Sequence, residues 1–102
     1  MQAKELARLI KTGKAPCIVD VRSRGEFASG HIAGAVHLPL WAVLLRSSGL
    51  PADKDAPLVV LCEMGPRAEL AQSLLGLKGR RRSELLDGHM SGWRRAGLPL
   101  VK

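Results

Sequence analysis

The sequence predicts an α/β domain in which a small parallel sheet is covered by helices on both faces. Two short runs, residues 17–21 and 58–61, are apolar on both sides, as the strands of buried parallel sheets are. Segments with helical spacing of apolar residues alternate with such runs, which is the pattern of a parallel α/β sheet. The length of 102 residues accommodates one domain, residues 1–102, and the chain has no internal repeat or boundary.

The first third of the chain predicts a helix, a strand and a second helix. Apolar residues three and four apart indicate an amphipathic helix over residues 3–12. The strand at residues 17–21 follows it. Ser23 and Glu26 then have the spacing of a capping box, which predicts a short helix that ends at Gly30.

The middle of the chain predicts two more strands. Residues 35–38 form a mainly apolar run closed by Pro39, and residues 40–46 have helical character. A polar connection leads from there to residues 58–61, which form the clearest buried strand in the sequence.

The last third predicts a helix, a short strand and a final helix. Pro66 suits the first turn of a helix, because its missing N–H costs nothing there. Residues 84–86 form the last predicted strand, and a helix around Trp93 ends before Gly97. The apolar stripe expected on the helix that starts at Pro66 consists of Leu70, Ala71, Leu74 and Leu75.

The composition fits a chain that folds without metal or disulfide. Hydrophobic residues make up 46% of the sequence, which is enough to form a core. Two widely separated cysteines suggest neither a disulfide framework nor a zinc ligand set. No apolar run has the length of a membrane span, and the N-terminal residues lack the order of a secretion signal. We therefore expect a cytoplasmic protein that has no membrane partner.

The net charge of +7 raises the question of nucleic acid binding. The positive residues are not interleaved with aromatic residues and belong to no recognisable nucleic-acid module, so we expect a solvated basic edge instead. Such an edge attracts small anions and acidic proteins. The excess is concentrated in Lys78, Arg80, Arg81, Arg82, Arg94 and Arg95.

The loop over residues 62–67 has the residues of a reactive site. Cys62 follows a buried strand and precedes a helix, and ligands of open α/β sheets bind at the carboxyl ends of the strands. Loop N–H groups and the helix N-terminus there form an anion site that favours a thiolate over a thiol. Gly65 permits a tight turn, and Arg67 adds a cation suited to an oxyanion. The alternative, a small core cysteine, does not explain the Gly-Pro-Arg sequence that follows.

Three blocks of the sequence together resemble the signatures of rhodanese domains. The first is Asp-Val-Arg at residues 20–22 with Gly-His-Ile-Ala-Gly-Ala at residues 30–35. The second is Cys-Glu-Met-Gly-Pro-Arg-Ala at residues 62–68, and the third is Leu-Asp-Gly-His at residues 86–89 with Trp93. The resemblance covers nearly the whole chain. It implies a three-layer α/β/α fold with four to five parallel strands, of which we expect four because the usual first strand is missing.

The resemblance also implies a reaction and roles for the site residues. Cys62 would take a sulfane sulfur from thiosulfate or a persulfide donor, form a cysteine persulfide, and pass the sulfur to a thiol or cyanide. No cofactor or metal is needed. Within the loop, Arg67 would orient the anionic donor. The residues expected to bind substrate are Glu63, Met64, Gly65, Pro66 and Arg67. Asp20 is expected to support the loop as a hydrogen-bond acceptor, and Arg22 and Glu26 are expected to brace it as an intradomain ion pair.

Two other functions stay open at this point. The domain could be a sulfur relay whose role is set by a partner protein that accepts the sulfur, which Glu63 and the basic residues 78–82 favour. It could also be a non-catalytic interaction domain, although the presence of Cys62 argues against this. The sequence does not specify the natural donor or an oligomeric state.

The position of the arginine separates sulfur transfer from phosphatase chemistry. Related cysteine-dependent phosphatases place arginine six residues after the cysteine, because their longer loop encloses a phosphate. In this chain Arg67 is the fifth residue after Cys62 and the sixth is Ala68. The loop therefore predicts sulfur transfer and neither phosphatase nor arsenate reductase activity.

Several residues have alternative roles. Glu63 is an unusual neighbour for a cysteine that attacks anions. His89 replaces a glycine of the closing signature and puts a titratable ring near the mouth of the site. Trp93 is expected in the core, whereas Trp41 lines the site or packs conventionally. Cys17 is expected to be an inert core thiol, unless its strand brings it within disulfide distance of the reactive cysteine.

Overall fold

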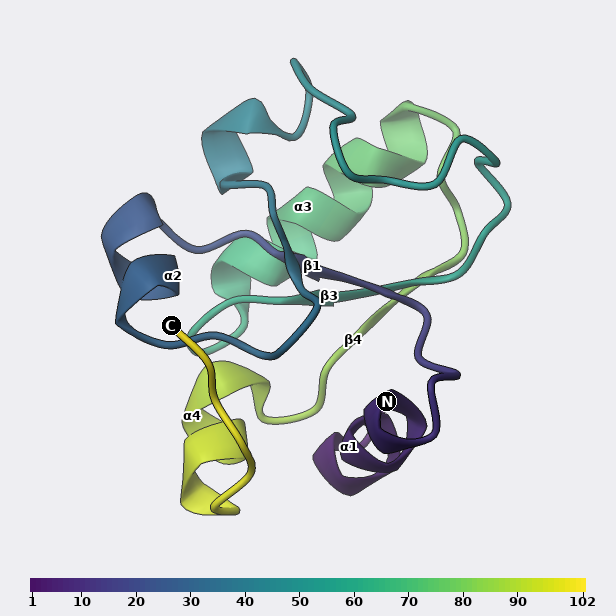
Figure 1. The fold of residues 1–102 in the computed structure, drawn as a ribbon. Coiled ribbons are helices and arrows are strands. Elements are labelled where there is room, and N and C mark those ends of the chain that lie inside the picture. The colour runs from purple at the N-terminus through teal and green to yellow at the C-terminus, as the bar shows by residue number, and fades with distance from the viewer.

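Four parallel strands form the middle of the molecule, and helices lie on either side of them (Figure 1). The computed structural model describes all residues, 1–102. The elements in chain order are α1 (Ala3–Lys11), β1 (Cys17–Asp20), α2 (Arg24–Ser29), β2 (Val36–His37), the 3₁₀ helix η1 (Leu40–Ala42), β3 (Leu58–Leu61), α3 (Pro66–Leu77), β4 (Ser83–Leu85) and α4 (His89–Arg95). The predicted α/β class and the expectation of four strands are confirmed.

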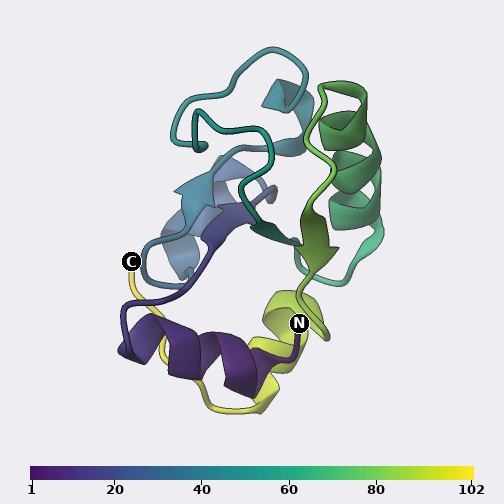
Figure 2. The same ribbon diagram turned by 90° about the vertical axis from the view of Figure 1, so that its right-hand side faces the viewer.

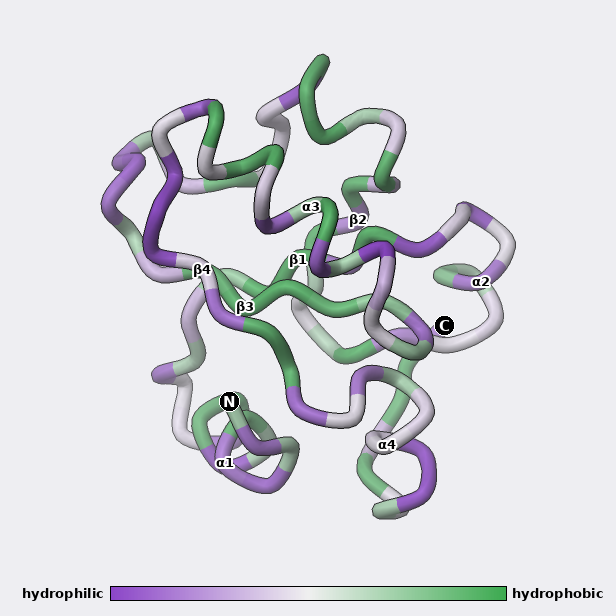
Figure 3. Tube along the Cα trace, turned by 180° about the vertical axis from the view of Figure 1, so that it is seen from behind, coloured by the Kyte–Doolittle hydropathy of each residue, from purple (hydrophilic) through white to green (hydrophobic).

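The sheet has the order β2-β1-β3-β4, so the two most apolar strands occupy its centre. Figure 2 shows α1 and α4 on one side of the sheet and α3 on the other. Leu58 and Val60 of β3 belong to the core cluster on the α3 side, whereas Val59 and Leu61 belong to the cluster with α1 and α4. This alternation follows from the two-residue period of a strand. In Figure 3 consecutive residues of β3 and most of β1 are green, and because successive side chains point to opposite faces, both faces of these strands carry apolar residues.

Local signals for two elements are confirmed in detail. Ser23 caps α2 by accepting a hydrogen bond from the backbone N–H of Glu26, whose carboxylate accepts one from the N–H of Ser23 in return. Trp93 of α4 is 1% exposed and donates its indole N–H to the carbonyl of Pro99 at 2.8 Å. The capping box therefore fixes the start of α2, and Trp93 ties α4 to the segment that follows it.

The predicted helix over residues 40–46 is wrong in length. Only the three residues of η1 are helical, and turns follow them. A seven-residue helix forms too few hydrogen bonds to offset its nucleation and needs packing on one face. Trp41 and Leu45 are instead 64% and 77% exposed, and the guanidinium of Arg46 lies over the tryptophan ring, 4.7 Å from its centroid. Trp41 therefore does not belong to the core.

Two smaller expectations also need correction. Leu70 is exposed, and the buried stripe of α3 consists of Ala68, Ala71 and Leu75. Arg80, in the connection from α3 to β4, is only 5% exposed and therefore does not belong to the solvated basic edge. No helix is long and apolar enough to cross a membrane.

Candidate active site

The candidate site lies at the carboxyl ends of β1 and β3. The chain leaves β1 toward β2 on one side and returns to β3 on the other, so the strand order reverses between these two strands. Ligands of open α/β sheets bind at such a reversal. Asp20 ends β1 in register with Leu61, the residue before Cys62. Residues from two distant sequence blocks therefore meet around Cys62.

The Cys62 loop holds its sulfur by a backbone hydrogen bond. The N–H of Gly65 donates to Sγ of Cys62 at 3.0 Å, and the cysteine is fully buried. Gly65 has a φ of 132°, which a residue with a Cβ adopts only under strain. Pro66 begins α3 as predicted. The N–H groups of Glu63 and Met64 donate to no protein atom, so the fold leaves two donors free beside the sulfur-binding turn.

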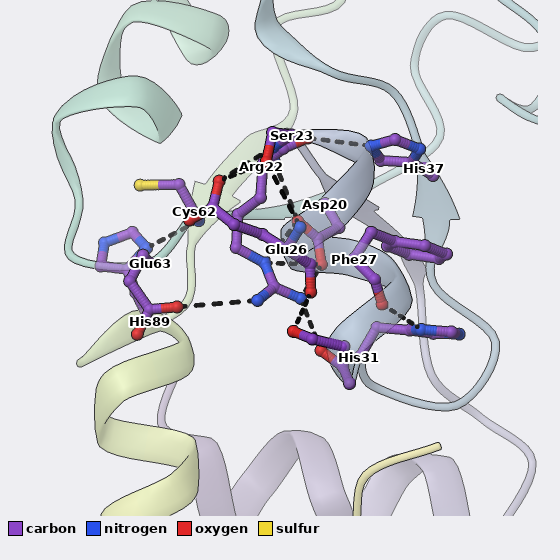
Figure 4. A network of polar contacts seen from close by, with 12 residues as sticks. Asp20, Arg22, Ser23, Glu26, Phe27, His31, His37, Cys62, Glu63 and His89 are labelled. Carbon is purple, nitrogen blue, oxygen red and sulfur yellow. Dashed lines mark hydrogen bonds and ion pairs between the residues drawn. The ribbon is translucent and has the colours of Figure 1, made fainter. Parts of the chain in front are cut away.

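A buried ion pair lies next to this loop. Arg22 and Asp20 are both fully buried. The carboxylate accepts from the backbone N–H of Arg22 at 3.0 Å and from Nη2 at 2.8 Å, and Nε also donates to both oxygens. Nη2 donates in addition to the carbonyl of Gly30 at 2.8 Å. The pair thus joins the end of β1 to the turn after α2 (Figure 4).

Glu63, the residue after Cys62, is held between two arginines. Its Oε1 lies 3.6 Å from Nη1 of Arg22, an otherwise unpartnered buried nitrogen. Its Oε2 accepts a hydrogen bond from Nη1 of Arg94 in α4, and this bond raises the pKa of the Arg94 guanidinium. The two cations offset the negative charge that the sequence places beside Cys62. No local pattern in the sequence points to Arg94, because it lies 31 positions away on another element.

Arg67 is bound to Glu26 by a two-pronged ion pair. Its Nη1 and Nη2 donate to the two carboxylate oxygens at 2.6 and 3.0 Å. These bonds lower the pKa of Glu26 to about 2, and the same carboxylate, with a smaller contribution from Cys62, raises the pKa of Arg67. Both side chains are about a third exposed. The ion pair expected between Arg22 and Glu26 is therefore wrong, because Glu26 pairs with Arg67 and Arg22 pairs with Asp20.

His89 lies against the loop from the other side. Its Nδ1 accepts a hydrogen bond from the N–H of Cys62 at 3.3 Å, and the residue is 8% exposed. Burial lowers the pKa of the His89 ring. In Figure 4 this ring and the sulfur of Cys62 lie on the same side of the view, away from Asp20. The expectation of a titratable ring at the site thus has a geometric basis.

The other two histidines hold the segment after β1. Nε2 of His37 lies 2.8 Å from the carbonyl of Arg22, and Nδ1 of His31 lies 2.9 Å from the carbonyl of Phe27. The phenyl ring stacks on both imidazoles, at centroid distances of 3.7 and 4.5 Å. We assign this stack a packing role, because it fixes the backbone of the residue that carries the buried cation.

A family model for the rhodanese-like domain matches residues 2–96 of this chain. The chain belongs to the rhodanese-like family. Its four-stranded parallel sheet with flanking helices is the rhodanese fold.

Relatives of this rhodanese-like chain carry sulfurtransferase names. It is 37% identical over 84 residues to a sulfurtransferase of Allochromatium vinosum, covering 82% of this chain and 77% of the relative. It is 38% identical over 77 residues to the thiosulfate sulfurtransferase GlpE of Ectopseudomonas mendocina, covering 76% and 69%. The structure of the human single-domain sulfurtransferase TSTD1 matches with a TM-score of 0.78 at 26% identity, covering 93% of this chain and 94% of that one.

The second cysteine of this rhodanese-like chain is far from the first. Cys17 pairs in register with Leu58, at the opposite end of β3 from Cys62. Four residues along a strand span about 13 Å, whereas a disulfide needs Cα atoms within about 7 Å. Both thiols are free, and burial raises the pKa of Cys17. A resolving role for Cys17 within one chain is therefore excluded in this fold.

A mainly apolar cavity of the rhodanese-like domain lies away from the Cys62 loop. It has a volume of about 520 Å³ and a mainly apolar lining that includes Ile10, Ile32 and Trp93. None of its lining residues comes from residues 62–67. The candidate active site is therefore a set of donors on a buried turn, which suits a small reactant, and not a large apolar pocket.

Proposed function

We propose that this rhodanese-like chain is a sulfurtransferase that works through a persulfide on Cys62. The thiolate attacks the outer sulfur of thiosulfate, the sulfur–sulfur bond of thiosulfate breaks, and sulfite leaves with the electron pair. A cyanide or thiol acceptor then attacks the terminal sulfur of the persulfide and releases the Cys62 thiolate. Sulfur moves in two displacement steps, so no cofactor or metal is needed.

One observation carries this proposal. The sulfur of Cys62 already accepts the N–H of Gly65 at 3.0 Å, at the carboxyl end of a central strand. A backbone donor aimed at a sulfur stabilises negative charge on it, as oxyanion-hole donors do for oxygen. The free N–H groups of Glu63 and Met64 give a donor or a terminal persulfide sulfur further hydrogen bonds without rearrangement of the sheet.

Arg67 has a more limited role in this proposal than the sequence alone predicts. One N–H of each Nη is already committed to Glu26. An arginine has five N–H donors, so those that remain can still bind the sulfite end of a donor. Cys62 makes a smaller contribution than Glu26 to the raised pKa of Arg67, which supports a role for Arg67 near the sulfur. We propose that Arg67 both anchors the loop to α2 and attracts the anionic donor.

A sulfur relay is the second candidate, and Glu63 is the observation that favours it. This carboxylate is 28% exposed beside the nucleophile. Although Arg22 and Arg94 bind it, it occupies cations that would otherwise bind a small dianion. A protein-borne persulfide or thiol presents less charge to the site. Since a nucleophilic thiol needs reducing surroundings, we also propose a cytoplasmic setting.

Mass spectrometry after incubation with thiosulfate tests the mechanism. We expect the wild-type chain to gain one sulfur atom, and Cys62→Ser to gain none. Cys17→Ser is the matched control, because it removes the other thiol at the far end of the sheet and should load normally. Sulfur on the Cys62→Ser variant would refute the proposal.

Steady-state kinetics separate the enzyme from the relay. A thiosulfate:cyanide sulfurtransferase turns over many times with both small molecules. A relay loads Cys62 but transfers slowly to cyanide and faster to a protein thiol. Rapid turnover with cyanide would rule out the relay as the main function, whereas a loaded chain that cyanide scarcely unloads would favour it.

A further inference from the structure

His89 has a left-handed backbone conformation, which residues other than glycine rarely adopt. Its φ is 53°, and every other residue with positive φ in the chain is glycine. It follows Gly88, which also has a left-handed φ of 77°. A histidine kept where glycine would avoid strain indicates that its side chain has a use. The ring is nearly buried, so that use lies inside the fold.

The hydrogen bond from Cys62 defines the state of the ring. Because Nδ1 accepts the N–H of Cys62, it carries no proton, and the neutral ring has its hydrogen on Nε2. Burial lowers the pKa of His89, against smaller opposing effects of Glu69 in α3 and Asp87 in the turn before α4. The ring is therefore neutral near pH 7, with Nε2–H as its only donor. The protein provides no acceptor for this donor, since the bond from Cys62 is the only one His89 makes through its side chain.

Nε2 lies beside the residue that binds the sulfur. A Cβ on Gly65 would be 3.3 Å from Nε2 and 3.4 Å from Cδ2 of His89. The N–H of the same glycine donates to Sγ of Cys62 at 3.0 Å. The absence of a side chain at Gly65 thus makes room for the edge of the imidazole next to the sulfur-binding turn.

We propose that Nε2–H of His89 binds the terminal sulfur of the Cys62 persulfide, which makes His89 a catalytic residue of this domain. The inference rests on the proposed function, because it assigns a donor to the intermediate of that reaction. The N–H groups of the turn then bind the persulfide from one side and the imidazole binds it from the other. The second nitrogen of the ring positions the nucleophile through the backbone of Cys62.

His89→Asn is the variant that isolates this donor. Asparagine tolerates the left-handed conformation, and its side-chain oxygen takes the place of Nδ1 as acceptor for the N–H of Cys62. It has no group at the position of Nε2. His89→Gln is the reciprocal variant, because its amide nitrogen reaches that position. His31→Asn is the matched control, since this histidine bonds the carbonyl of Phe27 and does not touch the loop.

The equilibrium of the loading step provides the readout. Thiosulfate and the Cys62 thiolate interconvert with persulfide and sulfite, so the persulfide fraction at a fixed thiosulfate-to-sulfite ratio reports its stability. We expect His89→Asn to lower this equilibrium constant about tenfold, the effect of one hydrogen bond to a charged group. His89→Gln should recover much of the loss, and His31→Asn should match wild type.

The pH profile gives a second readout. Protonation of His89 at Nδ1 removes the acceptor for the N–H of Cys62, so the loading constant of wild type should change below pH 6.5, the ordinary value for histidine. Glu69, Asp87 and the Cys62 sulfur itself are the other titratable groups facing the ring. His89→Asn should lack this acid change.

The outcomes separate the two proposals. A wild-type chain that takes up no sulfur would overturn the proposed function and the role of His89 with it. A wild-type chain that loads normally, with His89→Asn giving the same loading constant and pH profile, would overturn the role of His89 alone. If His89→Asn unfolds, His89→Gly replaces it, because glycine adopts this backbone without strain.

Discussion

Replacing Asp20 by asparagine tests how the fold supports the site. The new side chain would keep one oxygen that can accept from the backbone N–H and Nε of Arg22. It would also turn an amide N–H₂ toward Nη2, which now donates to the carboxylate at 2.8 Å. Arg22 is fully buried and would retain only Glu63, at 3.6 Å, as a counter-charge. The substitution therefore leaves a buried cation largely uncompensated.

The expected cost follows from this burial. Removing one partner of a buried ion pair costs about 3–5 kcal/mol. For a domain of this size, 1 kcal/mol lowers Tm by roughly 4–8 °C, so we expect Tm to fall by about 12–40 °C. Total stabilities of such domains are on the order of 5–15 kcal/mol. Asp20→Asn should thus remain folded at low temperature but lose much of its free energy of unfolding.

Glu26→Gln provides the matched control, because it makes the same chemical change in the Glu26–Arg67 pair. That pair is about a third exposed on both sides, and exposed pairs contribute about 1 kcal/mol or less. Urea unfolding followed by circular dichroism measures both variants. Equal losses for the two variants, or a loss below about 1 kcal/mol for Asp20→Asn, would refute the assignment of Asp20 and Arg22 as the main polar support of the loop.

Three further predictions concern the loop and its partners. The depressed pKa of Glu26, about 2 against its usual 4.5, means that its stabilising effect is complete above pH 4.5 and is lost toward pH 2. Urea midpoints of wild type should fall more than those of Glu26→Gln in that window, and parallel slopes would contradict this. Gly65→Ala should lower the free energy of unfolding by about 1–3 kcal/mol and abolish turnover, because the φ of Gly65 is 132° and the new Cβ would lie 3.3 Å from Nε2 of His89. A variant with the kcat of wild type would contradict this prediction. Glu63→Gln frees Arg22 and Arg94 to bind anions. The KM for thiosulfate should fall about fivefold, because removing the repulsion between one carboxylate and the anion is worth about 1 kcal/mol. A higher KM would show that Glu63 helps to bind the donor.

The arrangement of the fold was largely predictable because its signals are local. The apolar run before Cys62 has a side chain directed to each face, which only a central strand of a covered sheet satisfies. The capping box of Ser23 and Glu26 needs only two residues three apart. The segment over residues 40–46 lacked such a signal. Its apolar residues have helical spacing, but the fold offers no surface to bury Trp41 or Leu45, and the helix does not extend past η1.

The sequence predicts which residues belong to the candidate site, but it does not predict which of them form ion pairs. Cys62, Gly65 and Arg67 lie within six positions, so the sequence alone brings them together. Which acid binds which arginine depends on how β1, α2, the loop and α4 meet in space. Glu26 reaches Arg67 across 41 positions, and Arg94 reaches Glu63 across 31. The left-handed backbone of His89 likewise has no signature in the residue itself, since glycine is the usual marker of that conformation.

The pairings explain how an acid can follow the nucleophile. An unpaired carboxylate at Glu63 would repel both a Cys62 thiolate and an anionic donor. Arg22 and Arg94 bind one oxygen each, and Arg22 is itself fixed by Asp20, so two carboxylates share two arginines around the loop. The Glu26–Arg67 pair adds one more charge of each sign on the other flank. The charges of these side chains therefore sum to zero. At short range, the N–H of Gly65, the free N–H groups of the turn and the edge of His89 are the donors beside the sulfur-binding turn. These dipoles would bind a compact sulfur anion while the remaining N–H groups of Arg67 attract the donor, which fits the proposed site, where a persulfide is held and sulfite is released.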